Sequence, residues 1–305
     1  MTLKFVRSPL FYVGDKYKLM PQLRELFPDN INTFFDVFCG GGSASINTPA
    51  KRYVLNDINK KIIELHRFLL SQSTNMESFI KEMHKEINNY GLSLSELGNN
   101  TEIEKLKKEY KKTYFAKFNK ESYVKLRKNY NKNQSNTKLL YLLLVYGFNH
   151  MIRFNNSGEF NLPVGNVDWN KNVTNSLLGY SKWGKDNNII LTSGMDFERF
   201  IEEQDINKDD FIYFDPPYLI TNSEYNKFWN EVEEKRLYAL LDKLDKDGIK
   251  WGLSNMFRHK GTENNLLIEW SDKYHTYNIN SNYISRFDNS IKIESREIYV
   301  TNYKK

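Results

Sequence analysis

Short apolar runs, each ended by glycine, proline or aspartate, recur in two blocks of the chain and constrain its fold more than any other feature. Between the blocks, from about residue 71 to residue 185, the pattern becomes helical, polar and basic. Apolar strands separated by helices predict a largely parallel sheet that is covered on both faces. The sequence therefore predicts one α/β domain with a second domain inserted through it. The runs are TFFDVF, RYVLNDI, NNIILTSG, DFIYFDPPY, IKWGLSN and SREIYVTNY.

Two helices next to these runs have clear end signals. Asn59 is a suitable N-cap for a helix whose apolar face includes Ile62, Ile63 and Leu65. A second amphipathic helix is predicted over Val232–Leu244, and Asp247-Gly248 closes it. We expect the sheet domain to comprise residues 1–65 and 186–305 and the inserted domain to comprise residues 66–185.

Composition excludes several classes of protein. With 305 residues, 40% of them hydrophobic, the chain is long and apolar enough for a sizeable core. Its single cysteine, Cys39, rules out a disulfide framework and argues against a zinc-thiolate site, so we expect a reducing cytoplasm and no metal. No apolar run approaches the ~20 residues of a membrane span, and the N-terminal segment lacks the apolar stretch of a signal peptide.

Positive charge is concentrated in one part of the chain. Residues 104–132 contain eleven Lys or Arg and three Glu, a balance of +8, whereas the whole chain carries +6 and the remainder therefore −2. A local positive field of this kind suits a polyanion-binding surface, because each phosphate contact releases counterions. A solvated helix face explains the same pattern, and charge alone does not separate the two interpretations.

A glycine-rich turn follows the first apolar run. Cys39-Gly40-Gly41-Gly42-Ser43 lets the backbone approach a ligand closely at a strand end, although a purely structural turn is also consistent with it. The spacing does not match the GxGxxG or GxxxxGK[ST] patterns, which argues against dinucleotides and nucleoside triphosphates. Asp57 ends the next run and suits two ribose hydroxyls, although an acid at a strand end is also a common helix cap.

Asp215-Pro216-Pro217-Tyr218 is the most specific motif in the chain. It follows the apolar run Phe211–Phe214 directly. The two prolines forbid a helix and remove two backbone donors, so carbonyl groups are left exposed at the strand end. The Asp215 carboxylate and the Pro216 carbonyl supply two acceptors for an amine with two hydrogens, such as adenine N6. Tyr218 offers a ring on which a base can stack.

These motifs resemble the Dam-type, alpha-group DNA adenine methyltransferases over most of the chain and in the family's motif order. The resemblance implies a Rossmann-like S-adenosylmethionine-dependent methyltransferase sheet as the catalytic domain. It implies that residues 66–185 form a mainly helical DNA-recognition domain that carries a β-hairpin. FYVGDKYKL resembles the family's N-terminal cofactor segment, with Tyr12 where members more often have tryptophan.

The resemblance also assigns roles to residues of the predicted catalytic domain. The catalytic residues that it implies are Asp215, Pro216, Pro217 and Tyr218. The cofactor-binding residues that it implies are Tyr12, Lys16, Asp36, Phe38, Gly40, Gly42, Ser43, Asp57 and Asp215. Asp196 stands where the family has a short acidic motif, and we expect it to support the pocket. A loop near the DNA is expected over Asn282–Asn289.

FNHMIRFNNSGEFNLPVG, residues 148–165, resembles the family's DNA-recognition hairpin. The resemblance implies that Phe148 inserts or stacks at a gap in the duplex, that Arg153 reads a guanine and that Pro163 touches a thymine methyl. Two residues depart from the family pattern. His150 replaces a small residue, and Phe11 stands where Dam has a lysine that contacts the first guanine of GATC. The implied DNA-binding residues are Phe148, Asn149, Met151, Arg153, Asn155 and Pro163.

The expected activity is transfer of a methyl group from S-adenosylmethionine to N6 of an adenine flipped out of double-stranded DNA, at GATC or another GAT-containing site. Cytosine-N4 methyltransferases, RNA or protein-glutamine methyltransferases, and a nucleic-acid-binding protein with an inactive cofactor site are the alternatives. A cytosine-C5 enzyme is disfavoured because Cys39 lies in the glycine turn. We expect a cytoplasmic monomer, encoded by a prokaryote or a phage. Its expected partner is double-stranded DNA, with no obligatory protein partner and a restriction endonuclease as an optional companion.

Overall fold

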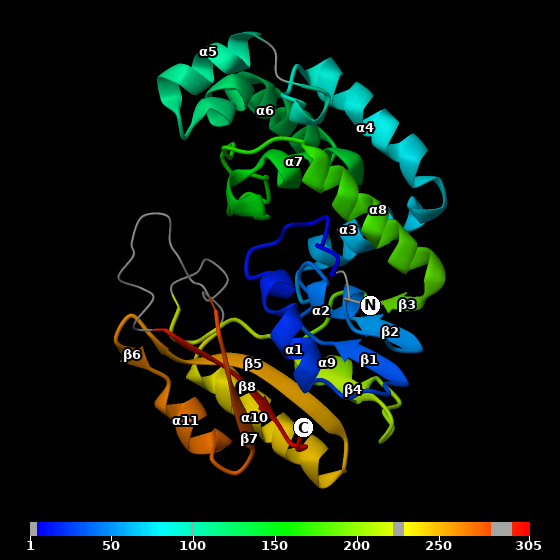
Figure 1. Cartoon of the computed structure of the whole chain (residues 1–305), viewed down its shortest axis with the longest axis vertical. Coiled ribbons are helices and arrows are strands. Elements are labelled where there is room, and N and C mark those ends of the chain that lie inside the picture. The colour runs from blue at the N-terminus through cyan, green and yellow to red at the C-terminus, as the bar shows by residue number, and fades with distance from the viewer. Residues whose placement is uncertain (1–4, 99–100, 222–228, 282–294) are drawn as a thin grey trace. The chain divides into compact units, whose positions relative to one another are not determined.

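A computed structural model describes residues 5–98, 101–221, 229–281 and 295–305, and the chain divides into two compact units (Figure 1). The sheet unit comprises residues 16–58 and 188–305, and the helical unit comprises residues 1–15 and 59–187. The loop expected at Asn282–Asn289 lies outside the described residues. None of the described helices is long and apolar enough to cross a membrane.

The sheet unit is built on one mixed sheet whose strand order is β3-β2-β1-β4-β5-β8-β7, with β6 paired to β5. The strands from β3 to β5 in this order are parallel, β8 is antiparallel to β5, and β7 is antiparallel to β8. The predicted largely parallel sheet is therefore confirmed, with an antiparallel end added. The strands are β1 (Thr33–Asp36), β2 (Arg52–Leu55), β3 (Asn188–Leu191), β4 (Phe211–Phe214), β5 (Lys250–His259), β6 (Thr262–Glu263), β7 (His275–Ile279) and β8 (Arg296–Thr301).

One face of the sheet is covered by aromatic packing around Phe27, which follows helix α1 (Met20–Leu26). The ring of Phe27 lies 5.1 Å from both Phe211 and Tyr213 on β4 and 6.1 Å from Phe34 on β1. Successive strand residues point to opposite faces. The next residues along these strands therefore face the other side, and both faces need apolar residues, which explains the continuous apolar runs.

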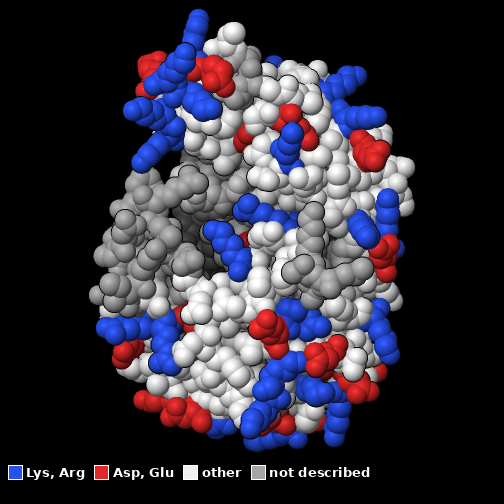
Figure 2. All heavy atoms as spheres, viewed as in Figure 1, with Lys and Arg blue, Asp and Glu red and all other residues white. Residues whose placement is uncertain are grey.

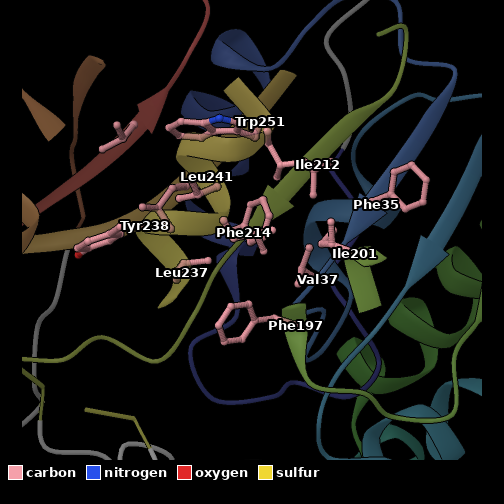
Figure 3. Close-up of a cluster of buried hydrophobic side chains, with 14 of the residues drawn as sticks. Phe35, Val37, Phe197, Ile201, Ile212, Phe214, Leu237, Tyr238, Leu241 and Trp251 are labelled. Carbon is pink, nitrogen blue, oxygen red and sulfur yellow. The ribbon is translucent and has the colours of Figure 1, made fainter. Parts of the chain in front are cut away.

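The opposite face packs against helices α9 (Phe197–Glu202) and α10 (Glu231–Lys246). Figure 3 shows Ile212 and Phe214 of β4 beside side chains from these helices, among them Phe197 and Leu237. Asn230 caps α10 by accepting from the backbone N–H groups of Val232 and Glu233, and Gly248 follows the helix with φ of 73°. The predicted helix thus exists and begins and ends close to the expected residues. The remaining helical elements of the sheet unit are η1 (Lys16–Lys18), α2 (Ser43–Ile46) and α11 (Asn265–Ser271).

The helical unit is organised around α7 (Thr137–Tyr146), in which every residue from Leu139 to Tyr146 is buried. Helices α3 and α6 pack against it, and Asn59 caps α3 as predicted, by accepting from the N–H of Lys61. A helix that is apolar all round is stable only inside a protein, so its neighbours must wrap it. The other elements are α3 (Lys60–Ser71), η2 (Ser73–Asn75), α4 (Met76–Tyr90), η3 (Ser95–Leu97), α5 (Thr101–Tyr110), α6 (Tyr114–Lys132), η4 (Phe148–His150) and α8 (Lys171–Asp186).

Candidate active site and nucleic-acid interface

The glycine turn lies at the carboxyl end of β1, between the ends of β2 and β4. Gly40 and Gly42 have φ of 46° and 75°, conformations that residues with a Cβ rarely adopt. The N–H of Gly42 donates to the carbonyl of Cys39, and α2 begins at the following residue, Ser43. Burial raises the pKa of the Cys39 thiol, so this cysteine is not the activated nucleophile that cytosine-C5 chemistry needs.

Asp57 joins the end of β2 to this turn. Its Oδ2 atom accepts from the N–H of Gly40 at 3.0 Å. Because β1 and β2 are parallel neighbours, the acid and the glycine turn meet at one edge of the sheet. The two features predicted separately from the sequence are thus brought together by strand pairing.

Asp36, the last residue of β1, lies beneath the turn. It is 1% exposed, and Ser45 Oγ donates to its Oδ2 at 2.6 Å. Burial raises the pKa of Asp36 to about 7, the Ser45 hydrogen bond opposes this rise, and the nearby Asp215 and Asp57 carboxylates add to it. Asp36 therefore supports α2 and the turn from inside, at an electrostatic cost.

Asp215 and Lys16 form a buried ion pair at the end of β4. Lys16 Nζ lies 2.8 Å from Asp215 Oδ1, and the two side chains are 7% and 17% exposed. Burial raises the pKa of Asp215, Lys16 opposes that rise by its charge and hydrogen bond, and Glu297 adds to the rise by its negative charge. Lys16 therefore favours the ionised form of this carboxyl, against the effect of burial on its pKa.

Tyr218 lies three residues further along the chain and is held by polar groups. Its hydroxyl lies 2.9 Å from Glu297 Oε1 and 3.4 Å from Asp215 Oδ1, and Lys16 Nζ lies 5.1 Å from the ring centroid. Of the two prolines that separate Asp215 from Tyr218 in the sequence, Pro216 is buried and Pro217 is half-buried. Sequence reasoning missed Glu297. A charged residue at a buried position of the apolar strand Arg296–Thr301 was the available signal.

Two aromatic side chains pack against Phe38, which lies two residues beyond the end of β1. Its ring lies 5.7 Å from that of Phe197 and 5.6 Å from that of Trp229. The Trp229 indole N–H donates to Glu234 on α10, a buried carboxyl that also accepts from Asn264. An apolar aromatic wall therefore adjoins the glycine turn.

In the helical unit, residues 147–165 reverse direction as a hairpin-like segment. The expected strand pairing is limited to two isolated antiparallel bridges, Gly147 with Val164 and Phe154 with Phe160. Pro163 provides no N–H for a continuous ladder, although its carbonyl accepts from the N–H of Phe148.

The six predicted DNA-contacting residues all lie in this segment. Phe148 is 50% exposed, Asn149 is exposed with φ of 53°, and Met151 is half-buried. Arg153 is held in plane by Asn161, which accepts from Nε through its side chain at 2.9 Å and from Nη2 through its carbonyl at 3.1 Å. Asn155 accepts from the N–H groups of Ser157 and Glu159 and so shapes the tip.

The two departures from the family pattern contact each other. The rings of Phe11 and His150 lie 5.3 Å apart, and the guanidinium of Arg7 lies 4.7 Å from the Phe11 centroid. His150 Nδ1 also lies 3.1 Å from the carbonyl oxygen of Leu144. The two substitutions thus form one structural pair. Tyr12 is buried and also belongs to the helical unit.

The basic run of residues 105–132 lies on α5 and α6. Figure 2 shows Lys and Arg side chains gathered on the surface over these helices. Phe115, Tyr123 and Leu126 point into the unit from α6, so the lysines between them occupy its outer face. In the part of the chain that the structure describes, no cluster of His, Cys, Asp or Glu has a geometry that would hold a metal ion.

A mostly parallel sheet with acidic residues at the carboxyl ends of neighbouring strands is typical of ligand-binding α/β domains, and comparison with known proteins defines the class. The chain matches the model of the D12 class N6 adenine-specific DNA methyltransferases over residues 12–284. It belongs to this family. The match covers both the DPPY motif and the hairpin-like segment.

Individual relatives agree with this assignment. The modification methylase StsI of Streptococcus sanguinis is 35% identical over 99% of this chain and 44% of the relative. The type II methyltransferase M.FokI of Planomicrobium okeanokoites is 34% identical over 99% of this chain and 44% of its own length. The chain thus spans less than half the length of these two relatives. The type II methyltransferase M1.LlaDCHI of Lactococcus lactis subsp. cremoris is 28% identical over 96% of this chain and 94% of the relative.

Proposed function

We propose that this chain transfers a methyl group from S-adenosylmethionine to N6 of an adenine that is flipped out of double-stranded DNA. The observation that carries the proposal is the buried Lys16–Asp215 pair beside Tyr218, at the same sheet edge as the glycine turn. In this proposal, catalysis belongs to the sheet unit and DNA recognition belongs to the helical unit.

The residues at the sheet edge fit the proposed cofactor by their chemistry. Asp57 is an acid tied to the turn through Gly40, and an acid at this place suits ribose hydroxyls. Phe38 and Trp229 supply an apolar aromatic wall beside that turn. When bound, S-adenosylmethionine supplies an electrophilic methyl group, so the protein needs no nucleophile of its own.

The protein contributes acceptors and alignment. Lys16 and Tyr218 both approach Oδ1 of Asp215, which leaves Oδ2 to accept one hydrogen of a target amine. The Pro216 carbonyl accepts the second hydrogen in this proposal. Two acceptors on one amine direct its lone pair away from them, toward the methyl donor. The low exposure of Asp215 limits the access of water and strengthens these hydrogen bonds.

For DNA, the proposal uses the exposed ring of Phe148 and the oriented fork of Arg153. Phe148 fills the space that a flipped base leaves, and Arg153 donates to O6 and N7 of a guanine. Lysines of α5 and α6 contact phosphates. The proposed target is GATC or another site that contains GAT. Because two relatives are named as type II methyltransferases, a restriction endonuclease of matching specificity is a proposed companion, and the chain is proposed to act as a monomer.

Transfer of radiolabelled methyl groups to duplex DNA, followed by nucleoside analysis, tests the proposal. We expect N6-methyladenine with the wild type and a loss of about 100-fold or more for Asp215→Ala, since such a group acts mainly in the transition state. DNA affinity should change little. Asp272→Ala, which removes an exposed carboxyl of the same unit, is the matched control. Activity of the Asp215 variant within about tenfold of wild type would exclude this role, and label on cytosine N4 would favour that alternative chemistry.

A further inference from the structure

Glu297 is a buried carboxyl in the middle of β-sheet pairing. It lies on β8, where its backbone neighbours across the sheet are Met256 on β5 and Ile279 on β7. Its side chain is 2% exposed, and the following residues, Ile298, Tyr299 and Val300, are fully buried. The position is therefore one that an apolar side chain normally occupies.

Glu297 has few compensating partners. Among the described residues it forms no salt bridge, and Lys16, which lies beside the Tyr218 ring, is paired with Asp215. Its Oε1 atom accepts from the Tyr218 hydroxyl, but no described residue donates to its Oε2 atom. Burying a carboxyl is costly unless its oxygens are fully hydrogen-bonded or paired with a cation, and apolar residues usually occupy such positions. Fold stability therefore does not account for a carboxyl at this position, whereas its hydrogen bond to Tyr218 in the candidate site does.

The Tyr218 hydroxyl has one hydrogen and two carboxyl groups within reach. The distance to Glu297 is 2.9 Å and the distance to Asp215 is 3.4 Å, so Glu297 is the better acceptor. A hydrogen bond to Glu297 leaves Asp215 free of the tyrosine hydrogen. It also restrains rotation of the Tyr218 ring, whose hydroxyl is tied to a strand 79 residues away in sequence.

We propose that Glu297 is a positioning residue that holds the Tyr218 ring in the plane on which the target adenine stacks. The inference rests on the proposed function, because it requires a flipped base. Glu297 touches neither the base nor the methyl donor in this proposal and positions the ring through the tyrosine hydroxyl. A ring that is free to rotate would still stack on the base, but less often in the geometry that aligns the amine with Asp215.

Emission from 2-aminopurine placed at the target adenine reports directly on this stacking. In the complex with S-adenosylhomocysteine, the wild type should quench the flipped 2-aminopurine by stacking it on Tyr218. Glu297→Ala should give clearly brighter emission and a kcat lower by about tenfold to a hundredfold, because misplacement of a reacting group by a fraction of an ångström to about 1 Å costs rates of this order. The Kd for DNA should stay within about threefold, since phosphate contacts dominate affinity.

Three further variants separate positioning from general damage. Glu297→Gln keeps a carbonyl acceptor in the same shape, so it should recover most of the lost kcat and the quenched emission. Tyr218→Phe should reproduce Glu297→Ala, and the double variant Tyr218→Phe/Glu297→Ala should be no worse than either single one. Glu263→Ala removes an exposed carboxyl on β6 and should match the wild type.

The outcomes distinguish this inference from the proposal on which it rests. If the wild type methylates adenine but Glu297→Ala keeps its kcat and its quenched emission, the positioning role is wrong. The role is equally wrong if Glu297→Gln is as impaired as Glu297→Ala, or if the two losses add in the double variant. If Glu297→Ala does not fold, Tyr218→Phe and Glu297→Gln still decide the question. A wild type that methylates no adenine and flips no base would instead overturn the proposed function.

Discussion

Asp215 is useful to the proposed reaction only as a carboxylate, and its surroundings oppose that form. Burial and the neighbouring charge of Glu297 raise its pKa, while Lys16, 2.8 Å away, lowers it. A carboxyl with a raised pKa loses its charge as the pH falls through that raised value. The fall of kcat/KM at acid pH therefore reports on the protonation of Asp215.

Lys16→Met should move the acid limb of the kcat/KM profile to higher pH. Removal of the cation leaves burial and Glu297 to act on Asp215, so its pKa rises further. Single-turnover methyl transfer between pH 5 and pH 9 measures the shift. Lys18→Met changes the exposed lysine of the same short helix η1 and should leave the profile where it was. An unchanged limb in Lys16→Met would mean that another group controls it.

The buried carboxyl of Asp36 makes the free energy of unfolding depend on pH. Burial raises its folded-state pKa to about 7 from 3.8, so the folded protein holds this proton more tightly than the unfolded chain does. The resulting penalty is absent well below pH 3.8, grows as the pH rises toward 7 and stays constant above it. A rise in pKa of this size corresponds to a loss of about 4 kcal/mol in the free energy of unfolding above pH 7.

Asp36→Asn should therefore increase the free energy of unfolding at pH 8 and increase it less at pH 5. The amide keeps an acceptor for Ser45 but has no charge to desolvate. Urea unfolding at the two pH values, with Asp209→Asn as an exposed control, measures the difference. A stabilisation that is equal at both pH values, or a destabilisation at pH 8, would contradict the assigned cause.

At the scale of the element, the hairpin-like segment depends on close backbone contact and not on a long ladder. A Cβ at Gly165 would lie 2.6 Å from the carbonyl oxygen of Gly147, a backbone atom that cannot swing away. The N–H of Gly165 also donates to the carbonyl of Tyr146 at 2.8 Å. Close backbone packing between Gly147 and Gly165 therefore closes the base of the segment and fixes where Phe148 and Arg153 lie.

Gly165→Ala should weaken specific DNA binding by about tenfold or more, because a shifted base of the segment misplaces its base-contacting residues. Binding of S-adenosylmethionine should be unaffected. Titration with a fluorescent cognate duplex and calorimetry with the cofactor measure the two effects. Asn156→Ala, at the exposed tip, is the control. Wild-type DNA affinity in Gly165→Ala would show that the close approach is not needed.

At the scale of the whole molecule, the sequence predicted the helices and strands that are determined by their own residues. Apolar runs predicted β1 to β5 and β8, and capping residues predicted the ends of α3 and α10. Strand β7 was not predicted, because His275–Ile279 is polar and largely exposed and becomes a strand only by pairing with β8. The β-hairpin expected within residues 148–165 is limited to two isolated bridges, and Pro163 has no N–H to give to a ladder.

The residues of the candidate site were likewise predictable only where a continuous motif contains them. The DPPY motif and the glycine turn are continuous in the sequence and were visible in it, and a resemblance supplied Lys16. The pairing of Tyr218 with Glu297 joins residues 79 apart, and that of Phe11 with His150 joins residues that no local pattern connects. Such partners are chosen by the three-dimensional arrangement, so sequence reasoning from single motifs cannot supply them.

Base-resolution sequencing of methylated positions in plasmid DNA from cells that express the chain tests the central claim most directly. We expect N6-methyladenine confined to one short sequence that contains GAT, and its absence when Asp215→Ala is expressed to the same level. Methylation at cytosine, or methyladenine that persists in the Asp215 variant, would contradict the proposed chemistry of the site.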